Sequence, residues 1–171
     1  PFVIESIAAT DETCPGLCDG TMVVSAPGAT AYSLNGGLPQ FGPIFSNVCP
    51  GAQQVTAVNS SGCLAQAGAN VAPGLPVVAG FTASPAVATT LNPHFELTNT
   101  SVNGMEYLWN LGPLGTSTDV DVSLTLPEAP GETTVCLTTT NSQGCTDSYC
   151  SALIVLLDFA LYVPNAFSPD G

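Results

Sequence analysis

Short runs of β-branched and aromatic residues recur along this chain, and each run ends at residues that favour a tight turn. No stretch shows the sustained apolar period of about 3.6 residues that marks an amphipathic helix. The turns recur at intervals of roughly 8 to 12 residues, which is typical of β-sandwiches. The chain is therefore predicted to be all-β. The turn-forming pairs include Pro27-Gly28, Asn35-Gly36, Pro50-Gly51, Asn103-Gly104 and Pro130-Gly131.

The length of 171 residues suits two small sandwiches in tandem, and a Pro/Gly-rich stretch at residues 71–76 predicts the boundary between them. A local repeat supports the division. Residues 50–63 (PGAQQVTAVNSSGC) return as residues 130–145 (PGETTVCLTTTNSQGC). The second copy is two residues longer, which keeps each strand side chain on its original face. We predict modules at residues 1–72 and 77–157, followed by an apolar segment at residues 158–171.

The chain contains no lysine or arginine and 13 acidic residues, so its formal net charge is −13. Nucleic-acid binding draws its affinity from Lys and Arg, so that function is excluded. Anionic membrane surfaces would repel the chain. Its most apolar run, residues 152–163, is shorter than the roughly 20 residues of a membrane-spanning helix, and Asp158 interrupts it. We therefore predict no membrane insertion and interpret the run as a strand.

Seven cysteines in a chain rich in Gly and Pro indicate disulfide bonds, and hence a secreted or cell-surface location. Zinc is the competing interpretation. Zinc sites favour C-x2-C pairs, whereas the close pairs here are C-x3-C (Cys14, Cys18) and C-x4-C (Cys145, Cys150). The odd number leaves at least one thiol unpaired or linked to another chain. The chain starts at Pro1 without a recognisable signal peptide, so we expect a processed or excised segment.

Three stretches resemble known families. Residues 5–70 resemble the SprB-type repeat of gliding-motility surface adhesins, through CPGLCDG at residues 14–20, YSLNG at 32–36, VCPG at 48–51 and Gly62-Cys63. Residues 77–157 resemble a PKD domain, through FTASP at residues 81–85, FELTNT at 95–100, YLWNLG at 107–112 and VCLT at 135–138. Residues 162–171 (YVPNAFSPDG) resemble the opening of the gliding-motility-associated C-terminal domain, a type IX secretion sorting module. Together the resemblances imply two tandem Ig-like β-sandwiches with an apolar C-terminal strand.

The first resemblance also implies two disulfide bonds, Cys14–Cys63 and Cys18–Cys49. In the second module the prediction comes from spacing. Counting outward in twos from the turn at residues 141–144 puts Cys136 and Cys150 on one face and nearly opposite each other. We therefore predict a Cys136–Cys150 bond. Cys145 is left as the unpaired thiol, either a buried bystander or an intermolecular link.

Few other residues suggest chemistry. Trp109 is either a sugar-stacking platform or the core tryptophan of a sandwich, and we favour the core. Asp119 and Asp121 alternate with apolar residues as in a strand, and form a weak Ca²⁺ candidate, because calcium needs 6–8 oxygen ligands. His94, the single histidine, is predicted to face outward, and no GxSxG elbow accompanies it. We therefore predict neither a catalytic site nor a firmly bound cofactor.

The C-terminal segment is an apolar strand without a sheet of its own. Phe159, Leu161, Val163 and Phe167 form its candidate association face. Such a strand can add to the open sheet edge of a neighbouring module or an identical subunit. Because the donor and acceptor surfaces differ, repeated addition would build a fibre.

Together these observations predict a non-enzymatic, extracellular structural or adhesive segment of a type IX-secreted cell-surface protein, serving as a stalk or fibre module. One alternative is a self-assembling filament subunit joined through its C-terminal strand. A second alternative is an accessory module that binds surface polysaccharides or calcium.

Overall fold

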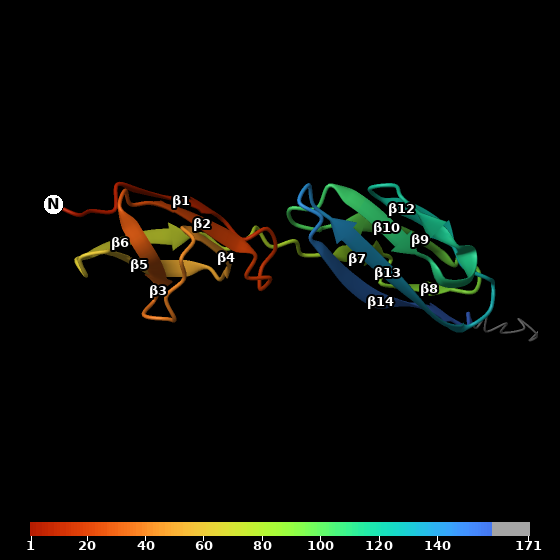
Figure 1. Cartoon of the computed structure of the whole chain (residues 1–171). Coiled ribbons are helices and arrows are strands. Elements are labelled where there is room, and N and C mark those ends of the chain that lie inside the picture. The colour runs from red at the N-terminus through yellow and green to blue at the C-terminus, as the bar shows by residue number, and fades with distance from the viewer. Residues whose placement is uncertain (159–171) are drawn as a thin grey trace, which may run out of the picture. The chain divides into compact units, whose positions relative to one another are not determined.

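The computed structural model describes residues 1–158, which divide into two compact units (Figure 1). Unit 1 comprises Pro1–Val77 together with Asn141–Cys145, and unit 2 comprises Val78–Thr140 and the described residues from Thr146 onward. The short segment at residues 141–145 groups with unit 1, although the sequence predicts that it belongs to the second module. The predicted association strand, with Phe159, Leu161, Val163 and Phe167, lies outside the described residues.

Unit 1 consists of two antiparallel sheets. One sheet has the order β1-β2-β4 and the other β3-β5-β6. The strands are β1 (Ser6–Thr10), β2 (Gly20–Ser25), β3 (Ala29–Leu34), β4 (Ile44–Val48), β5 (Gly51–Asn59) and β6 (Leu64–Val71).

Period-two alternation produces the core of unit 1. In β2, Met22 and Val24 are buried while Val23 between them is exposed. In β5, Val55 and Ala57 are buried in the same way. Successive strand side chains point to opposite faces, so these residues meet between the sheets. Burying each large apolar side chain contributes about 1.5–3 kcal/mol.

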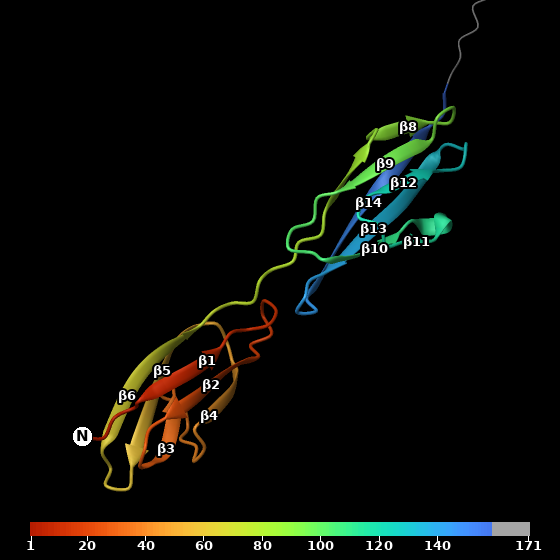
Figure 2. The same cartoon turned by 90° about the horizontal axis from the view of Figure 1, so that it is seen from above.

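Unit 2 is a sandwich with more strands than unit 1, and Figure 2 shows it from a second direction. Its sheets have the orders β11-β10-β13-β14-β8 and β12-β9-β7. Pairing is antiparallel except between β8 and β14, which run parallel. The elements are β7 (Phe81–Ser84), β8 (Val87–Thr89), β9 (His94–Asn99), β10 (Glu106–Asn110), the 3₁₀ turn η1 (Gly112–Leu114), β11 (Thr116–Ser117), β12 (Val122–Thr125), β13 (Gly131–Thr140) and β14 (Thr146–Leu156).

Trp109 lies at the centre of the unit 2 core. Its side chain is fully buried, and its ring centroid lies 5.1 Å from that of Phe81. A buried indole N–H needs an acceptor, and Trp109 Nε1 donates to the backbone carbonyl of Asp119 at 2.9 Å. The prediction of a core tryptophan is confirmed, and the alternative of a sugar-stacking platform is wrong.

The strand expected around Asp119 and Asp121 begins later than their alternation suggests. β12 starts at Val122, and both aspartates lie in the bend before it. One local hydrogen bond and one bond from β9 hold that bend. Asp119 Oδ2 accepts from Ser117 Oγ at 2.7 Å, and Asp121 Oδ1 accepts from the backbone N–H of Asn99 at 2.8 Å. Aspartate commonly stabilises turns through such bonds, so the alternating pattern here does not mark a strand.

No helix within residues 1–158 is long and apolar enough to cross a membrane.

Candidate functional site

The loop between β1 and β2, residues 11–19, is organised around the buried side chain of Glu12, which is 4% exposed. Glu12 Oε1 accepts from the backbone N–H of Cys18 at 2.8 Å, and Oε2 accepts from that of Gly74 at 3.3 Å. The Glu12 backbone N–H donates to the carbonyl of Ala72 at 3.1 Å. A buried carboxylate needs hydrogen-bond donors, and backbone N–H groups supply them in a chain without lysine or arginine. Glu12 thus fastens the loop to the segment after β6.

Gly74 is required where this segment meets the loop. A Cβ atom at position 74 would lie 2.7 Å from the carbonyl oxygen of Thr13 and 2.8 Å from Cys14 Cα. Both are backbone atoms, which cannot move aside as the end of a long side chain can. A glycine therefore allows the two backbones to approach this closely.

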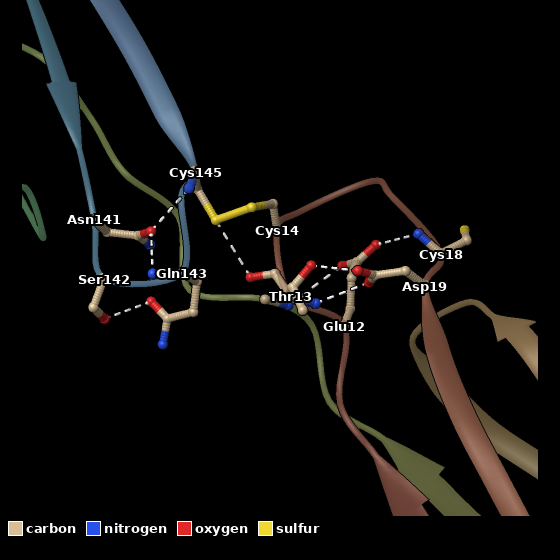
Figure 3. The surroundings of a disulfide bond; sticks show 10 residues. Glu12, Thr13, Cys14, Cys18, Asp19, Asn141, Ser142, Gln143 and Cys145 are labelled. Carbon is tan, nitrogen blue, oxygen red and sulfur yellow. Dashed lines mark hydrogen bonds between the residues drawn. A yellow bond between two sulfur atoms is a disulfide. The ribbon is translucent and has the colours of Figure 1, made fainter.

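A second carboxylate holds the other side of the loop. Asp19 Oδ1 accepts from the backbone N–H of Thr13 at 2.9 Å, and Oδ2 accepts from the Thr13 hydroxyl. These two bonds, the hydroxyl first, lower the pKa of Asp19 below its ordinary value because they favour the charged form. The loop therefore presents Cys14 from a framework fixed by Glu12 and Asp19 (Figure 3).

Two of the expected disulfide pairs are present in the structure. Cys18 is bonded to Cys49, and Cys136 to Cys150. Cys136 and Cys150 are directly opposite in the β13–β14 register, which the spacing argument anticipated.

The remaining bond differs from the expectation. Cys14 is bonded to Cys145, with Cα atoms 5.6 Å apart (Figure 3). Cys63 is the free thiol among the described residues. The predicted Cys14–Cys63 bond and the prediction that Cys145 is unpaired are therefore corrected. Cys145 Sγ also lies 3.3 Å from the Thr13 carbonyl oxygen.

Strand length explains the correction. The backbone N–H of Glu12, near Cys14, donates a hydrogen bond to the carbonyl of Ala72, which directly follows β6. Cys63 instead directly precedes the start of that strand. The 8 residues of β6 span about 26 Å at about 3.3 Å per residue. A disulfide needs Cα atoms within about 7 Å, so the fold of unit 1 keeps Cys14 and Cys63 apart.

The turn that carries Cys145 is built on Asn141, which is 7% exposed. Asn141 Oδ1 accepts from the backbone N–H of Gln143 at 3.0 Å and of Cys145 at 2.9 Å. Its Nδ2 is buried and has no hydrogen-bond partner among the described residues. This turn was predicted from the sequence, but the roles of Asn141 and Glu12 were not. The Asn-Ser-x-Gly-Cys repeat was the available signal for Asn141, while no local pattern marked Glu12.

His94 lies on the exposed face of β9, as predicted. Its Nε2 lies 2.8 Å from Glu96 Oε1 and 3.4 Å from Ser123 Oγ. In a Ser-His-acid triad the hydroxyl and the carboxylate use opposite ring nitrogens, whereas here both approach Nε2. The contact with His94, followed by that with Ser123, lowers the pKa of Glu96. The arrangement is a surface hydrogen-bond cluster.

Asp119 and Asp121 are exposed, and their carboxylates receive the separate hydrogen bonds described above. Within residues 1–158, no group of three or more His, Cys, Asp and Glu side chains is placed to hold a metal ion. Calcium binding at the two aspartates stays a prediction.

An open depression of about 590 Å³ lies on the outer face of unit 2 at β10 and β13. Leu108 and Val120 contribute exposed apolar surface to it, and Glu106, Thr118 and Thr138 contribute polar atoms. This mixture of apolar surface and hydroxyl or carboxylate groups could accept a small polar ligand.

No protein-family model matches the chain, and no curated protein matches it. Solved structures give similarities of fold. The chain is similar to the PKD1 domain of the Vibrio cholerae metalloprotease PrtV at 26% identity, covering 48% of this chain and 99% of that one, with a TM-score of 0.41. Fibronectin(III)-like modules of Clostridium thermocellum CbhA match at 10% identity over 89% of this chain and 94% of that one, with a TM-score of 0.37. Three N-terminal domains of the bacteriophage RB49 outer capsid protein Hoc match at 13% identity over 91% of this chain and 59% of that one, with a TM-score of 0.48. No function follows from these matches.

Proposed function

We propose that this chain is a non-enzymatic, extracellular structural or adhesive segment of a cell-surface protein, in which its units serve as stalk or fibre modules. The observation that carries the proposal is that three disulfide bonds cross-link the fold. The bonds Cys14–Cys145, Cys18–Cys49 and Cys136–Cys150 join residues 131, 31 and 14 positions apart. Disulfides of this kind persist in oxidising surroundings outside the cytosol.

The size of the largest closed loop also favours a structural role. In the chain-entropy model, closing a loop of 131 residues lowers the conformational entropy of the unfolded state, which stabilises the folded state by about 5 kcal/mol. Such a bond limits how far the protein can open when heat or force acts on it. Resistance of this kind suits a stalk module that is exposed to mechanical load.

The type IX export route and the relation to SprB-type adhesins are part of the same proposal. They are supported by the sequence resemblances of residues 5–70 and 162–171 described above. The absence of lysine and arginine suits a surface that must avoid binding nucleic acids and anionic lipids.

A saccharide-binding role is the second candidate, and the depression beside Leu108 is the observation that favours it. Half of the Leu108 side chain is exposed there, next to the polar groups of Glu106 and Thr138. A sugar ring could place its apolar face on Leu108 and its hydroxyl groups on the polar atoms.

Negative-stain electron microscopy of the full, non-reduced chain tests the main proposal, together with a glycan array and calcium calorimetry on the same sample. We expect dispersed particles that bind neither glycans nor Ca²⁺. Regular filaments that disappear when residues 158–171 are deleted would favour the self-assembling subunit, and filaments that survive the deletion would rule out joining through the C-terminal strand. Glycan binding lost in Leu108→Asp, but kept in Leu91→Asp on another exposed site, would favour the saccharide-binding role.

A further inference from the structure

The two turns of the internal repeat have the same structure. In each turn the Asn backbone N–H donates to the Cys carbonyl, at 3.1 Å for Asn59 and 3.0 Å for Asn141. The Gly N–H donates back to the Asn carbonyl, at 3.0 Å and 3.1 Å. The Asn Oδ1 accepts from the Cys N–H at 2.9 Å in both turns. The repeat therefore places Cys63 and Cys145 in equivalent positions.

The backbone of the two turns agrees as well. Gly62 and Gly144, which precede the two cysteines, have φ values of +78° and +85°. Each turn connects the two strands of a long antiparallel hairpin, β5–β6 in one case and β13–β14 in the other. The cysteine thus leaves each hairpin tip from the same local geometry.

The two cysteines differ in their bonding. Cys145 is buried and bonded to Cys14 of the β1–β2 loop, whereas Cys63 is exposed and free. One of the two equivalent turns therefore shows which kind of cysteine bonds to this position. It is a cysteine in the loop between the first two strands of a module, as Cys14 is.

Within one molecule Cys63 cannot obtain such a partner. Cys14 is already bonded, and the length of β6 separates the two residues. A loop cysteine that bonds Cys63 would therefore have to come from another module.

We propose that Cys63 forms a disulfide bond with a cysteine of another module of the same kind, at the position that Cys14 holds in the β1–β2 loop. Such modules are then joined from the loop of one to the hairpin turn of the other. The inference rests on the proposed function, because it takes the chain as a segment of a modular surface protein. The turn of residues 59–63 then has the same role as the turn of residues 141–145.

The bond forms by thiol–disulfide exchange with a small-molecule disulfide such as oxidised glutathione. The Cys63 thiolate attacks one glutathione sulfur, forms a mixed disulfide and releases one glutathione thiolate. The loop-cysteine thiolate then attacks the Cys63 sulfur and releases the second glutathione. The two protein thiols lose two protons and two electrons, and oxidised glutathione is reduced to two thiols.

The test uses the full chain as both donor and acceptor. Cys145→Ala frees Cys14, so each molecule carries one loop thiol and one turn thiol. In a glutathione redox buffer we expect disulfide-linked oligomers in which Cys14–Cys63 bonds exceed the two homotypic bonds combined by at least about threefold. Peptide mapping by mass spectrometry after cleavage at acidic residues identifies the bonds. Random pairing gives as many Cys14–Cys63 bonds as homotypic bonds of both kinds combined, and this result would overturn the proposal.

Cys14→Ala is the matched control, since it also leaves two free thiols but both are in turns. It is expected to give no extended oligomers. Circular dichroism melts of both variants establish that they are folded.

A second measurement keeps wild-type protein as the acceptor, with Cys63 as its free thiol. The donors are C63A/C145A, activated at Cys14, and C14A/C63A, activated at Cys145, each as a mixed disulfide with thionitrobenzoate. The rate at which each donor reacts with wild-type protein is divided by the rate at which it reacts with free cysteine. This ratio corrects for the accessibility of the activated sulfur. We expect the Cys14 donor to react at least about tenfold faster, and equal corrected rates would contradict the proposal. Neither result affects the microscopy and glycan tests of the proposed function, which are made on wild-type protein.

Discussion

Breaking the Cys14–Cys145 bond is expected to change how far the chain can be stretched. When the chain is pulled by its ends, this bond carries the force directly from residue 14 to residue 145. The residues between them stay off the tensioned path, even after the units unfold. The double variant C14A/C145A returns those residues to the path, except where the other two bonds still lock the chain.

The added length follows from the bond positions. Subtracting the 31- and 14-residue separations of the other two bonds from the separation of 131 leaves 86 residues. At about 3.6 Å per extended residue, these add about 310 Å of contour length.

Single-molecule force spectroscopy with handles at the two chain ends measures this difference. Wild type and C63A, which keeps all three bonds, should give the same contour length, and C14A/C145A should exceed both by about 310 Å. Equal lengths for wild type and C14A/C145A would refute the reasoning, because they would mean that the bond does not shorten the force path.

Three further variants probe the loop and the turn. Gly74→Ala should lower the free energy of unfolding by about 1–3 kcal/mol in urea titrations, since its Cβ would overlap backbone atoms, whereas Gly42→Ala, in open space, should have little effect. Asn141→Ala should lower it by about 1–3 kcal/mol in the same assay by leaving two turn N–H groups without their acceptor; no change would show that water replaces the side chain. The lowered pKa of Asp19 gives stability that is present above about pH 4 and lost as the pH falls through the folded-state pKa. Thr13→Ala should therefore lose less stability than wild type between pH 6 and pH 3, and parallel pH profiles would contradict this assignment.

Features set by neighbouring residues were predictable from the sequence. The turn at residues 141–144 fixes the β13–β14 register, so the opposition of Cys136 and Cys150 could be obtained by counting outward. Period-two alternation and the turn pairs also indicated the all-β class. The buried position of Trp109 was predicted from the core tryptophan that is typical of such sandwiches.

Features set by distant contacts were not predictable in this way. The Cys14–Cys145 bond joins residues 131 positions apart, and strand periodicity carries no information at that range. The parallel pairing of β8 with β14 is non-local for the same reason. At Asp119 and Asp121 the alternating pattern is compatible with a strand, but the two residues form a bend instead. Asp119 is held by the nearby Ser117 hydroxyl, and Asp121 by the backbone N–H of Asn99, which is 22 positions away in the chain.

The long-range bond has a consequence for a chain exposed to hydrolytic enzymes. Cutting one peptide bond normally separates a protein into two pieces. A single cut anywhere between Cys14 and Cys145 leaves both pieces joined through sulfur. The Pro/Gly-rich stretch at residues 71–76 lies inside this interval, so it can be severed while the two ends of the molecule remain attached.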